Sequence, residues 1–449
     1  MKFNKKTEHK SSQVNAILKL ADEWVEHNTN YKFCVDNETF YEYKNGYYSP
    51  MHDKSFERML YESEEFLYLT SAKIKELMHR ISVLTLMEYD KFNAEEILNF
   101  KNGIYDIKKD KFYAHSSKYL STIRIPYLYD HDATCPLWIS FLNECLQNNQ
   151  EYIGLLQEFM GYCLGRDNSL HKALILTGDG RNGKGTTFRM IEKMVGSENC
   201  SSVDIDKLSD QTNVINIFGK LINIDGDVNT DARGFESAFR KITGGDSIMA
   251  KMLYKNVFSF KPFSKLIIGA NELPHIADKT HGFYDRLLVI PYEVSFAGRE
   301  DRTLEPRLEK EVSGVLNWAL EGRRRLYQRG DFKMNKQSFD IVDDIKRENN
   351  PVFFFIDDCC EIKMQDKDML YTLKSDMYVH YRIYCRNSGY KALSKHRFGR
   401  EFYRIMKQYT DNDARLGGAN RAHIWENIVI IGDFYSKYSK NELEMDWNV

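Results

Sequence analysis

The feature that most constrains the fold is a run of short apolar segments between about residues 172 and 291. Four of these segments read as strands: "ALILTG", "KLINIDGD", "KLIIGANE" and "RLLVIPY". They alternate with helical and loop sequence, a pattern typical of a mainly parallel sheet with helices packed against it. We therefore expect an α/β domain in the middle of this 449-residue chain.

A glycine-rich loop follows the first of these strands. The segment "GDGRNGKGTTF" has the pattern G-x-x-x-x-G-K at Gly178, Gly183 and Lys184, after an apolar strand at 173–176 and before a helix that begins "TTFRMIEKMV". In such a loop the backbone N–H groups and the helix N-terminus surround phosphates, and the lysine reaches the β- and γ-phosphates. The pattern predicts a nucleotide site rather than a chance glycine loop.

The residue after the lysine departs from the usual pattern, because Gly185 stands where Ser or Thr is expected. We expect Thr186 to supply the hydroxyl on the Mg²⁺ side, with Thr187 as the less favoured substitute. Lys-Gly-Thr also occurs in small nucleotide kinases. The loop alone therefore leaves kinases, GTPases and motors open.

Polar residues follow the next two strands. The strand in "KLINIDGD" ends in Asp225 and Asp227, which alternation places on one side if the strand continues. A carboxylate at such a strand end holds Mg²⁺ or its water, and a second one polarises the attacking water, although Asp-Gly is also a turn dipeptide. Asn271 follows "KLIIGA" and predicts a contact with the γ-phosphate or the attacking water; the alternative is a capping or turn asparagine.

Two cationic features complete the set. Arg286 begins the fourth strand, and arginine is suited to stabilise charge on a transferring phosphoryl group, often from a neighbouring subunit. A surface salt bridge with Asp285 is the alternative. Lys251, Lys255 and Asn256 lie on a hairpin that predicts contact with a phosphate backbone; a solvated pair of lysines is the alternative.

Taken in this order, the motifs resemble those of superfamily 3 helicases, the hexameric AAA-type motors of viruses, phages and mobile elements. The phage/plasmid primase–helicase branch, shared with poxvirus-type helicases, looks most similar. Its loop pattern G-x-G-x-N-G-K is matched at Gly178, Gly180, Asn182, Gly183 and Lys184. The segments "KLINIDGD", "ITGGDSIMAKMLYKNVFSFKP", "ANELP" and "DRLLVIPY" are similar to its acidic, DNA-contacting, asparagine and arginine motifs. Size and organisation also resemble replication initiator–helicases of staphylococcal pathogenicity islands or cassette elements.

The resemblance implies ATP and Mg²⁺ as cofactors and a homo-hexamer with ATP bound between subunits. The implied nucleotide-binding residues are Gly178, Gly180, Asn182, Gly183, Lys184, Gly185, Thr186 and Thr187. Thr186 and Asp225 are the expected metal ligands, although Gly226 between the two aspartates leaves open which of Asp225 and Asp227 serves the metal and which the water. Asn271 senses the γ-phosphate, and Arg286 reaches in from the next subunit. Lys251, Lys255 and Asn256 are expected to bind DNA in the central channel.

Four regions are expected along the chain: an N-terminal α+β domain over 1–133, a helical collar or linker over 134–170, the ATPase core over 171–335 and a C-terminal winged helix over 336–449. In the first, Asn45-Gly46 predicts a hairpin turn. In the last, "SKHRFGREFYRIM" is the candidate recognition helix, with Ser394 as N-cap and with Lys395, Arg397 and Arg400 on its first turns. A tail that packs on the motor and reads no DNA is the alternative.

Composition sets the remaining limits. The net charge of −2 excludes a histone-like basic protein but permits local basic patches. No segment approaches the roughly 20 apolar residues of a membrane span, and the eight cysteines form no C-x-x-C pair, so we expect a cytoplasmic protein with no membrane partner. The residues before about position 95 are too few for a primase module. We expect a helicase without primase activity that unwinds DNA during replication of a mobile element.

The expected partners are single-stranded, forked and origin DNA, together with a primase or other replication proteins. Two other functions are open. One is an ATP-dependent origin-binding switch that never unwinds DNA, and the other is a nucleotide kinase, although about 170 residues precede the loop here.

Overall fold

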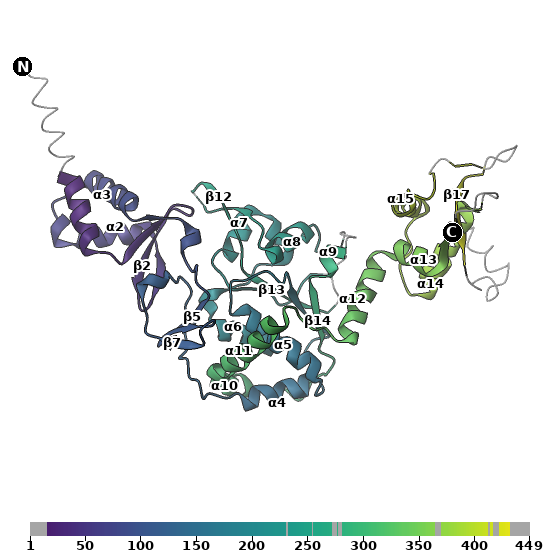
Figure 1. The fold of residues 1–449 in the computed structure, drawn as a ribbon, viewed down its shortest axis with the longest axis horizontal. Helices are drawn as coiled ribbons and strands as arrows, with labels where there is room; N and C mark the ends of the chain where they lie inside the picture. Colours follow the sequence, from purple (N-terminus) through teal and green to yellow (C-terminus); the bar gives the residue numbers. More distant parts are fainter. Residues whose placement is uncertain are drawn as a thin grey trace, which may run out of the picture. The chain divides into compact units, whose positions relative to one another are not determined.

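The computed structural model describes residues 16–431 apart from 230–231, 254, 272–275, 277–280, 364–369, 412–413 and 416–421. The described residues form two compact units of mixed α/β structure (Figure 1). The first comprises those of Met1–His275 and Asp285–Ser338, and the second those of Ile276–Tyr284 and Phe339–Val449. Within the described part of the chain, no helix has the length and apolarity needed to cross a membrane.

The first unit begins with a small sheet covered by helices. A helix over residues 16–27 precedes the sheet, whose strand order is β3-β2-β1-β4. The elements are β1 (Tyr31–Cys34), β2 (Thr39–Lys44), β3 (Tyr47–Met51), α2 (Asp53–Glu62), α3 (Ser71–Leu84) and β4 (Leu86–Met87). The predicted hairpin turn at Asn45-Gly46 joins β2 to β3. Both residues have positive φ, +54° and +89°, as the twist of a tight hairpin requires.

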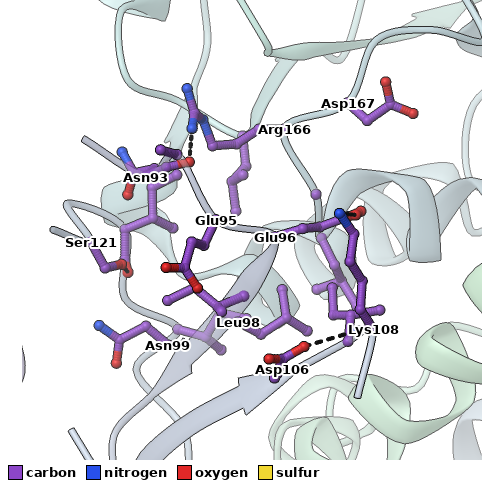
Figure 2. Close-up of a pocket in the computed structure, with 18 of the residues that line it drawn as sticks. Asn93, Glu95, Glu96, Leu98, Asn99, Asp106, Lys108, Ser121, Arg166 and Asp167 are labelled. Carbon is purple, nitrogen blue, oxygen red and sulfur yellow. Dashed lines mark hydrogen bonds and ion pairs between the residues drawn. The ribbon is translucent and has the colours of Figure 1, made fainter. Parts of the chain in front are cut away.

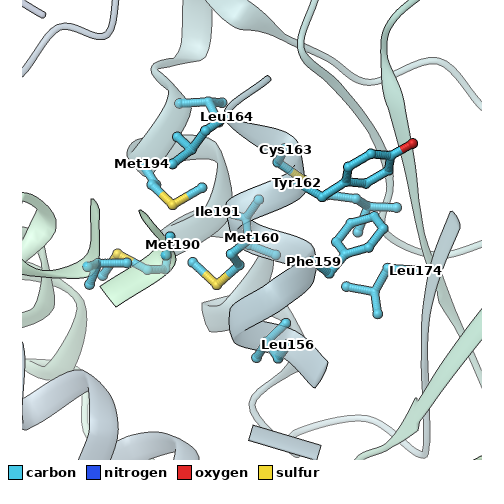
Figure 3. Close-up of a cluster of buried hydrophobic side chains, with 14 of the residues drawn as sticks. Leu156, Phe159, Met160, Tyr162, Cys163, Leu164, Leu174, Met190, Ile191 and Met194 are labelled. Atoms are coloured by element: carbon cyan, nitrogen blue, oxygen red, sulfur yellow. The ribbon is translucent and has the colours of Figure 1, made fainter. Parts of the chain in front are cut away.

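A three-stranded sheet and two helices follow: β5 (Ile97–Phe100), β6 (Gly103–Asp106), β7 (Lys111–Tyr113), α4 (Pro136–Cys145) and α5 (Gln150–Cys163). Helix α5 packs closely against α11 (Val312–Arg329). A Cβ atom at Gly161 would lie 2.3 Å from the carbonyl of Ala319, so only glycine allows this approach. Figure 3 shows the buried side chains of α5 beside Leu174 of the central sheet and Met190, Ile191 and Met194 of the helix after it.

Three consecutive arginines of α11 join these segments. Arg323 is buried and pairs with Glu96, just before β5. Arg324 binds Asp110 at 2.9 Å, and Arg325 binds Glu158 of α5 at 2.6 Å. One turn of α11 thus binds the segment around β5–β7 on one side and helix α5 on the other.

The central sheet has five parallel strands in the order β14-β8-β13-β10-β9, which confirms the predicted mainly parallel sheet. They are β8 (Ala173–Thr177), β9 (Cys200–Ser201), β10 (Ile222–Asp225), β13 (Lys265–Ala270) and β14 (Leu287–Pro291). Around them lie α6 (Lys184–Val195), α7 (Gln211–Val214), α8 (Glu236–Gly244), the hairpin β11 (Ile248–Lys251) and β12 (Val257–Phe260), and α10 (Leu304–Glu309). Because the strands are parallel, their carboxyl ends share one edge.

The second unit is built around an aromatic core. Its elements are α9 (His281–Tyr284), α13 (Pro351–Cys359), β15 (Cys360–Ile362), β16 (Tyr371–Leu373), α14 (Lys374–Asn387), α15 (Lys395–Met406), β17 (Ile424–Glu426) and β18 (Ile428–Ile430), and α12 (Lys336–Asn349) has residues in both units. Strand β15 pairs with β18 and β16 with β17, both antiparallel. Phe355, Tyr381, Phe398, Phe402 and Trp425 fill the space between these strands and the helices.

Candidate functional site

The loop between β8 and α6 has a backbone that only glycine fits at two positions. Gly178 has a φ of +129°, and a Cβ there would lie 2.2 Å from the carbonyl oxygen of Tyr292. Gly183 has a φ of +98°, and a Cβ there would lie 2.5 Å from Sγ of Cys145. Gly180 meets nothing within 4 Å, so close approach does not explain it. The loop is a tight cradle of the kind that brings backbone N–H groups toward an anion.

Asn182 and Tyr292 brace this loop. The Asn182 side chain donates from Nδ2 to the carbonyl of Tyr292 at 2.9 Å and accepts from the backbone N–H of Lys184 at 3.3 Å. The hydroxyl of Tyr292 shares a 2.9 Å hydrogen bond with Oγ1 of Thr187, and both side chains are buried. Sequence reasoning did not single out Tyr292 as a site residue, because nothing in "VIPY" indicates that its carbonyl meets a loop more than 100 residues earlier.

The two threonines differ in what their hydroxyls can do. Thr187 is fully buried and its hydroxyl is engaged with Tyr292. Thr186 is half-buried, with Oγ1 accepting from Nη2 of Arg189 at 3.4 Å. Of the two, Thr186 is the one whose hydroxyl borders open space beside the loop.

Lys184 lies at the centre of the site. Its ammonium donates to the carbonyl of Gly178 and lies 3.4 Å both from the carbonyl of Asp179 and from Oδ1 of Asn271. Burial lowers the pKa of Lys184, and the nearby carboxylates of Asp179 and Asp227 oppose that shift. The structure therefore brings together the predicted lysine, asparagine and second aspartate.

The strand register separates the two aspartates. Asp225 of β10 lies opposite Ile268 of β13, which lies opposite Ile175 of β8, two residues before that strand ends at Thr177. Its Oδ2 accepts from the backbone N–H of Ile205 at 2.9 Å, and burial raises its pKa. Asp227, two residues further on, is exposed and at the level of the loop. The pair therefore splits into a buried carboxylate that binds backbone and an exposed one whose charge opposes the lowering of the Lys184 pKa by burial.

Arg286 lies at the opposite edge of the sheet from the loop. It precedes Leu287, which pairs with Ala173 at the start of β8, and Pro291 pairs with Thr177 at its end. Five residues of strand, about 16 Å, separate the two edges. Nη1 of Arg286 lies 3.5 Å from Oγ1 of Thr243 in α8. Arg286 is therefore not part of the group formed by Lys184, Asn271 and Asp227.

The remaining predicted cations lie on the hairpin and on α15. Lys251 is exposed, whereas Lys255 and Asn256 bind residues of the N-terminal sheet. Lys395, Arg397 and Arg400 are all exposed on α15. The helix begins after Ser394 as predicted, but among the described residues the Ser394 side chain makes no capping hydrogen bond.

A cavity of about 470 Å³ adjoins the loop at Gly183 and Thr186. Phe141 of α4 and Phe296, after β14, contribute apolar walls, and Arg181 and Arg299 contribute charge. A volume of this size is in the range of small-molecule sites. Sequence reasoning missed this cavity because its walls come from three segments that share no local pattern.

A second cavity, of about 590 Å³, lies between β5, β6 and the end of α5 and includes no residue of the loop (Figure 2). Several of its polar groups have partners within the protein. Arg166 donates to the carbonyl of Asn93, Asp106 accepts from the backbone N–H of Lys108, and Glu96 pairs with Arg323. Two of these contacts attach the segment before β5 to α11 and to the residues after α5, and we assign no chemistry to this cavity.

The site fits a magnesium nucleotide by the chemistry of its donors. Among the residues that the structure describes, no three His, Cys, Asp or Glu side chains gather as a metal-binding group. The carboxylate of Asp227 and the hydroxyl of Thr186 are oxygen donors of the type that Mg²⁺ takes. This ion is commonly held by one or two protein oxygens together with substrate phosphates and water.

Three family models match separate parts of the chain. "D5 N terminal like" matches residues 19–147, "Family of unknown function (DUF5906)" matches 176–286, and "Poxvirus D5 protein-like" matches 347–440. The second of these covers the loop, both aspartates, Asn271 and Arg286.

Viral proteins with helicase names are among the relatives. "Putative helicase 121R" of Invertebrate iridescent virus 3 is 24% identical over 370 residues, 72% of this chain and 38% of that protein. "Putative helicase L207/L206" of Acanthamoeba polyphaga mimivirus is 26% identical over 230 residues, 47% of this chain and 23% of that protein. The chain therefore matches well under two thirds of the length of these relatives.

Solved structures of the NrS-1 C-terminal region in its apo form share the fold. One has a TM-score of 0.54 at 12% identity and covers 90% of this chain and 96% of that one. A second has a TM-score of 0.51 and covers 88% and 95%. The chain is thus similar to D5-type models at both ends and, over part of their length, to viral proteins named as putative helicases.

Proposed function

We propose that this chain is an ATP-driven DNA helicase motor of the superfamily 3 type, acting as a ring hexamer in replication of a phage, plasmid or other mobile element. The observation that carries the proposal is the proximity of Lys184, Asn271 and Asp227 at the carboxyl edge of a parallel sheet. They lie beside a loop in which two positions accept only glycine. The strand order β14-β8-β13-β10-β9 supports it, because the loop strand lies in the interior of the sheet between the strands that carry Arg286 and Asn271 at their ends.

In the proposed reaction the triphosphate of ATP enters the cradle between Gly178 and Gly183. The Lys184 ammonium then gives up its hydrogen bonds to the loop carbonyls and binds the β- and γ-phosphates instead. Phosphate oxygens carry full negative charge, so they attract the ammonium more strongly than a carbonyl dipole does. Asn271, next to the lysine, orients the γ-phosphate or the attacking water. A Mg²⁺ ion held by Thr186 and Asp227 would neutralise charge on the phosphates.

We propose that the nucleoside occupies the 470 Å³ cavity beside the loop. Thr186 borders this cavity as well as the loop, so the ribose and base have a direct path from the phosphates. Phe141 and Phe296 offer apolar and aromatic surface to the base.

The two aspartates are proposed to have different roles. We first expected Asp225 to bind the metal, but its carboxylate accepts a backbone hydrogen bond and lies two residues below the level of the loop. Asp227 is therefore the proposed ligand of the metal or its water. Asp225 is proposed to hold the segment at Ile205 against the end of β10.

This division gives a direct test. We expect Asp227→Asn to lower ATP turnover about 10²-fold, because the substitution removes the negative charge that is proposed to hold the metal beside the reacting phosphate. Asp225→Asn keeps an oxygen that can accept from Ile205, so turnover should fall less than about 5-fold. Steady-state hydrolysis with a magnesium titration measures both. The assignment is wrong if Asp225→Asn is the more damaging change while the folded protein melts at the same temperature.

DNA binding is proposed for two regions. Lys251 is an exposed cation on the β11–β12 hairpin, where a strand in the ring channel would pass. In the second unit, α14, α15 and the short antiparallel strands support a winged helix, with Lys395, Arg397 and Arg400 on the candidate recognition helix. We also propose that the host element is of the staphylococcal type and that a primase or other replication protein is a partner.

Hydrolysis of ATP with and without DNA, run beside a fork-unwinding assay, tests the whole proposal. We expect DNA-stimulated hydrolysis and strand separation. Slow hydrolysis with tight DNA binding and no separation would indicate an origin-binding switch. Phosphoryl transfer to a nucleotide without any dependence on DNA would indicate a kinase.

A further inference from the structure

The tip of the β11–β12 hairpin is bound to the N-terminal sheet. Nζ of Lys255 donates to the carbonyl of Asn37 at 3.2 Å, to the carbonyl of Glu38 at 2.6 Å and to Oγ1 of Thr39 at 3.3 Å. An ammonium group has three N–H donors, and these three oxygens match them. In this arrangement Lys255 has no donor left for a DNA phosphate.

Neighbouring groups strengthen the same contact. Nδ2 of Asn256 donates to the carboxylate of Glu38 at 3.0 Å, and the carboxylate of Asp53 lies 4.0 Å from the Lys255 ammonium. Glu38 has a φ of +50°, a backbone conformation in which its carbonyl and its side chain both meet the hairpin. We call Asn37, Glu38, Thr39 and Asp53 the latch.

One face of the rest of the hairpin is exposed, and the other, with Ala250 and Phe260, is buried. Lys251 is exposed, and Met249, Leu253 and Val257 are 56%, 79% and 47% exposed, which is high for apolar side chains. At its base, Phe218 contacts both Phe258 and Phe260 of β12 and also Tyr89 of the N-terminal part. The base is thus packed through contacts other than the latch, and the latch engages only Lys255 and Asn256 at the tip.

We propose that the latch is an autoinhibitory contact that competes with the phosphate backbone of single-stranded DNA for Lys255. This inference rests on the proposed function. Carbonyl, hydroxyl and carboxylate oxygens surround the ammonium where phosphate oxygens would bind, so Lys255 binds one partner at a time. By linkage, DNA binding opens the latch to the same extent that the latch weakens DNA binding.

The first experiment measures binding of a fluorescein-labelled oligothymidine by anisotropy. The variant Glu38→Asn/Thr39→Val shortens and neutralises one latch side chain and removes the hydroxyl of the other. Asn tolerates the positive φ and Val suits the start of a strand. We expect about 5-fold tighter binding, the size of one or two lost hydrogen bonds that compete with DNA. Glu64→Gln removes one exposed charge from the same part of the chain and should leave the affinity within about 2-fold.

The second experiment places the same pair of substitutions in a Lys255→Ala background. We expect no gain in affinity there, because the competed group is absent. A gain of equal size in both backgrounds would mean that the substitutions act through general charge and would overturn the latch.

The third measurement is hydrogen exchange without DNA. We expect the Glu38→Asn/Thr39→Val variant to exchange faster than wild type at the amides of 248–260, and oligothymidine to produce the same change in wild type. If wild type binds oligothymidine but neither affinity nor exchange responds to the substitutions, the latch is wrong and the motor proposal stands. If wild type neither binds DNA nor hydrolyses ATP with DNA stimulation, both fall.

Discussion

Replacing Lys184 by alanine should reduce ATP turnover by about 10²–10³-fold, with or without DNA. In the structure its ammonium is partly desolvated against the carbonyl of Gly178 and beside Asn271. A triphosphate offers this ammonium charged oxygens, so the interaction grows as charge develops on the leaving phosphates. A coupled hydrolysis assay at saturating ATP measures the loss.

Lys193→Ala is the matched control for that experiment. Lys193 lies on the same helix, pairs with Glu309 at 2.8 Å and is outside the site. Turnover should stay within about 2-fold of wild type, as expected for the loss of a surface ion pair. A Lys184→Ala protein that kept DNA-stimulated hydrolysis would contradict the nucleotide site itself.

Arg286→Ala should lower turnover by about 10³-fold while leaving ATP binding nearly unchanged. The arginine lies a full strand length from its own phosphate loop, so its proposed role in hydrolysis requires a site on a neighbouring subunit. Binding of a fluorescent ATP analogue separates the two effects. Lys172→Ala is the control, because Lys172 is a cation at the same sheet edge, bound to the carbonyl of Asp285.

Mixing two inactive proteins tests whether Arg286 acts between subunits. In a mixture of Arg286→Ala and Lys184→Ala, some interfaces pair an intact loop from the first protein with an intact arginine from the second. We expect partial recovery of hydrolysis, greatest near equal amounts. No recovery at any ratio, in a mixture shown to assemble by its mass, would contradict action in trans.

The parallel sheet and the glycine loop could be predicted because local patterns of residues indicate both. Apolar runs of strand length alternate with helical segments, and the glycines and lysine of the loop recur at a fixed spacing from Gly178 to Lys184. The split between Asp225 and Asp227 could not be predicted in the same way. Alternation puts both on one side of a strand, and only the pairing of β10 with β13 shows which of them reaches the loop.

Contacts made by backbone atoms also could not be predicted from the sequence. Lys255 was expected to face DNA, but its acceptors include the carbonyls of Asn37 and Glu38, more than 200 positions away. Every residue has a carbonyl, so no pattern of side chains signals such a partner. The same holds for Asn182, whose acceptor is the carbonyl of Tyr292.

Strand β14 has a consequence for the timing of events around a ring. Tyr292, just after its last residue, contacts the loop, and Arg286 precedes its first residue, while the strand between them is paired with β8 along its whole length. A small shift of the loop when a nucleotide binds would therefore move Arg286, which is proposed to act at the site of the next subunit. In a hexamer built from this chain, six such strands would link the six sites in a closed circle. The nucleotide state of each subunit would then determine when its neighbour can hydrolyse ATP.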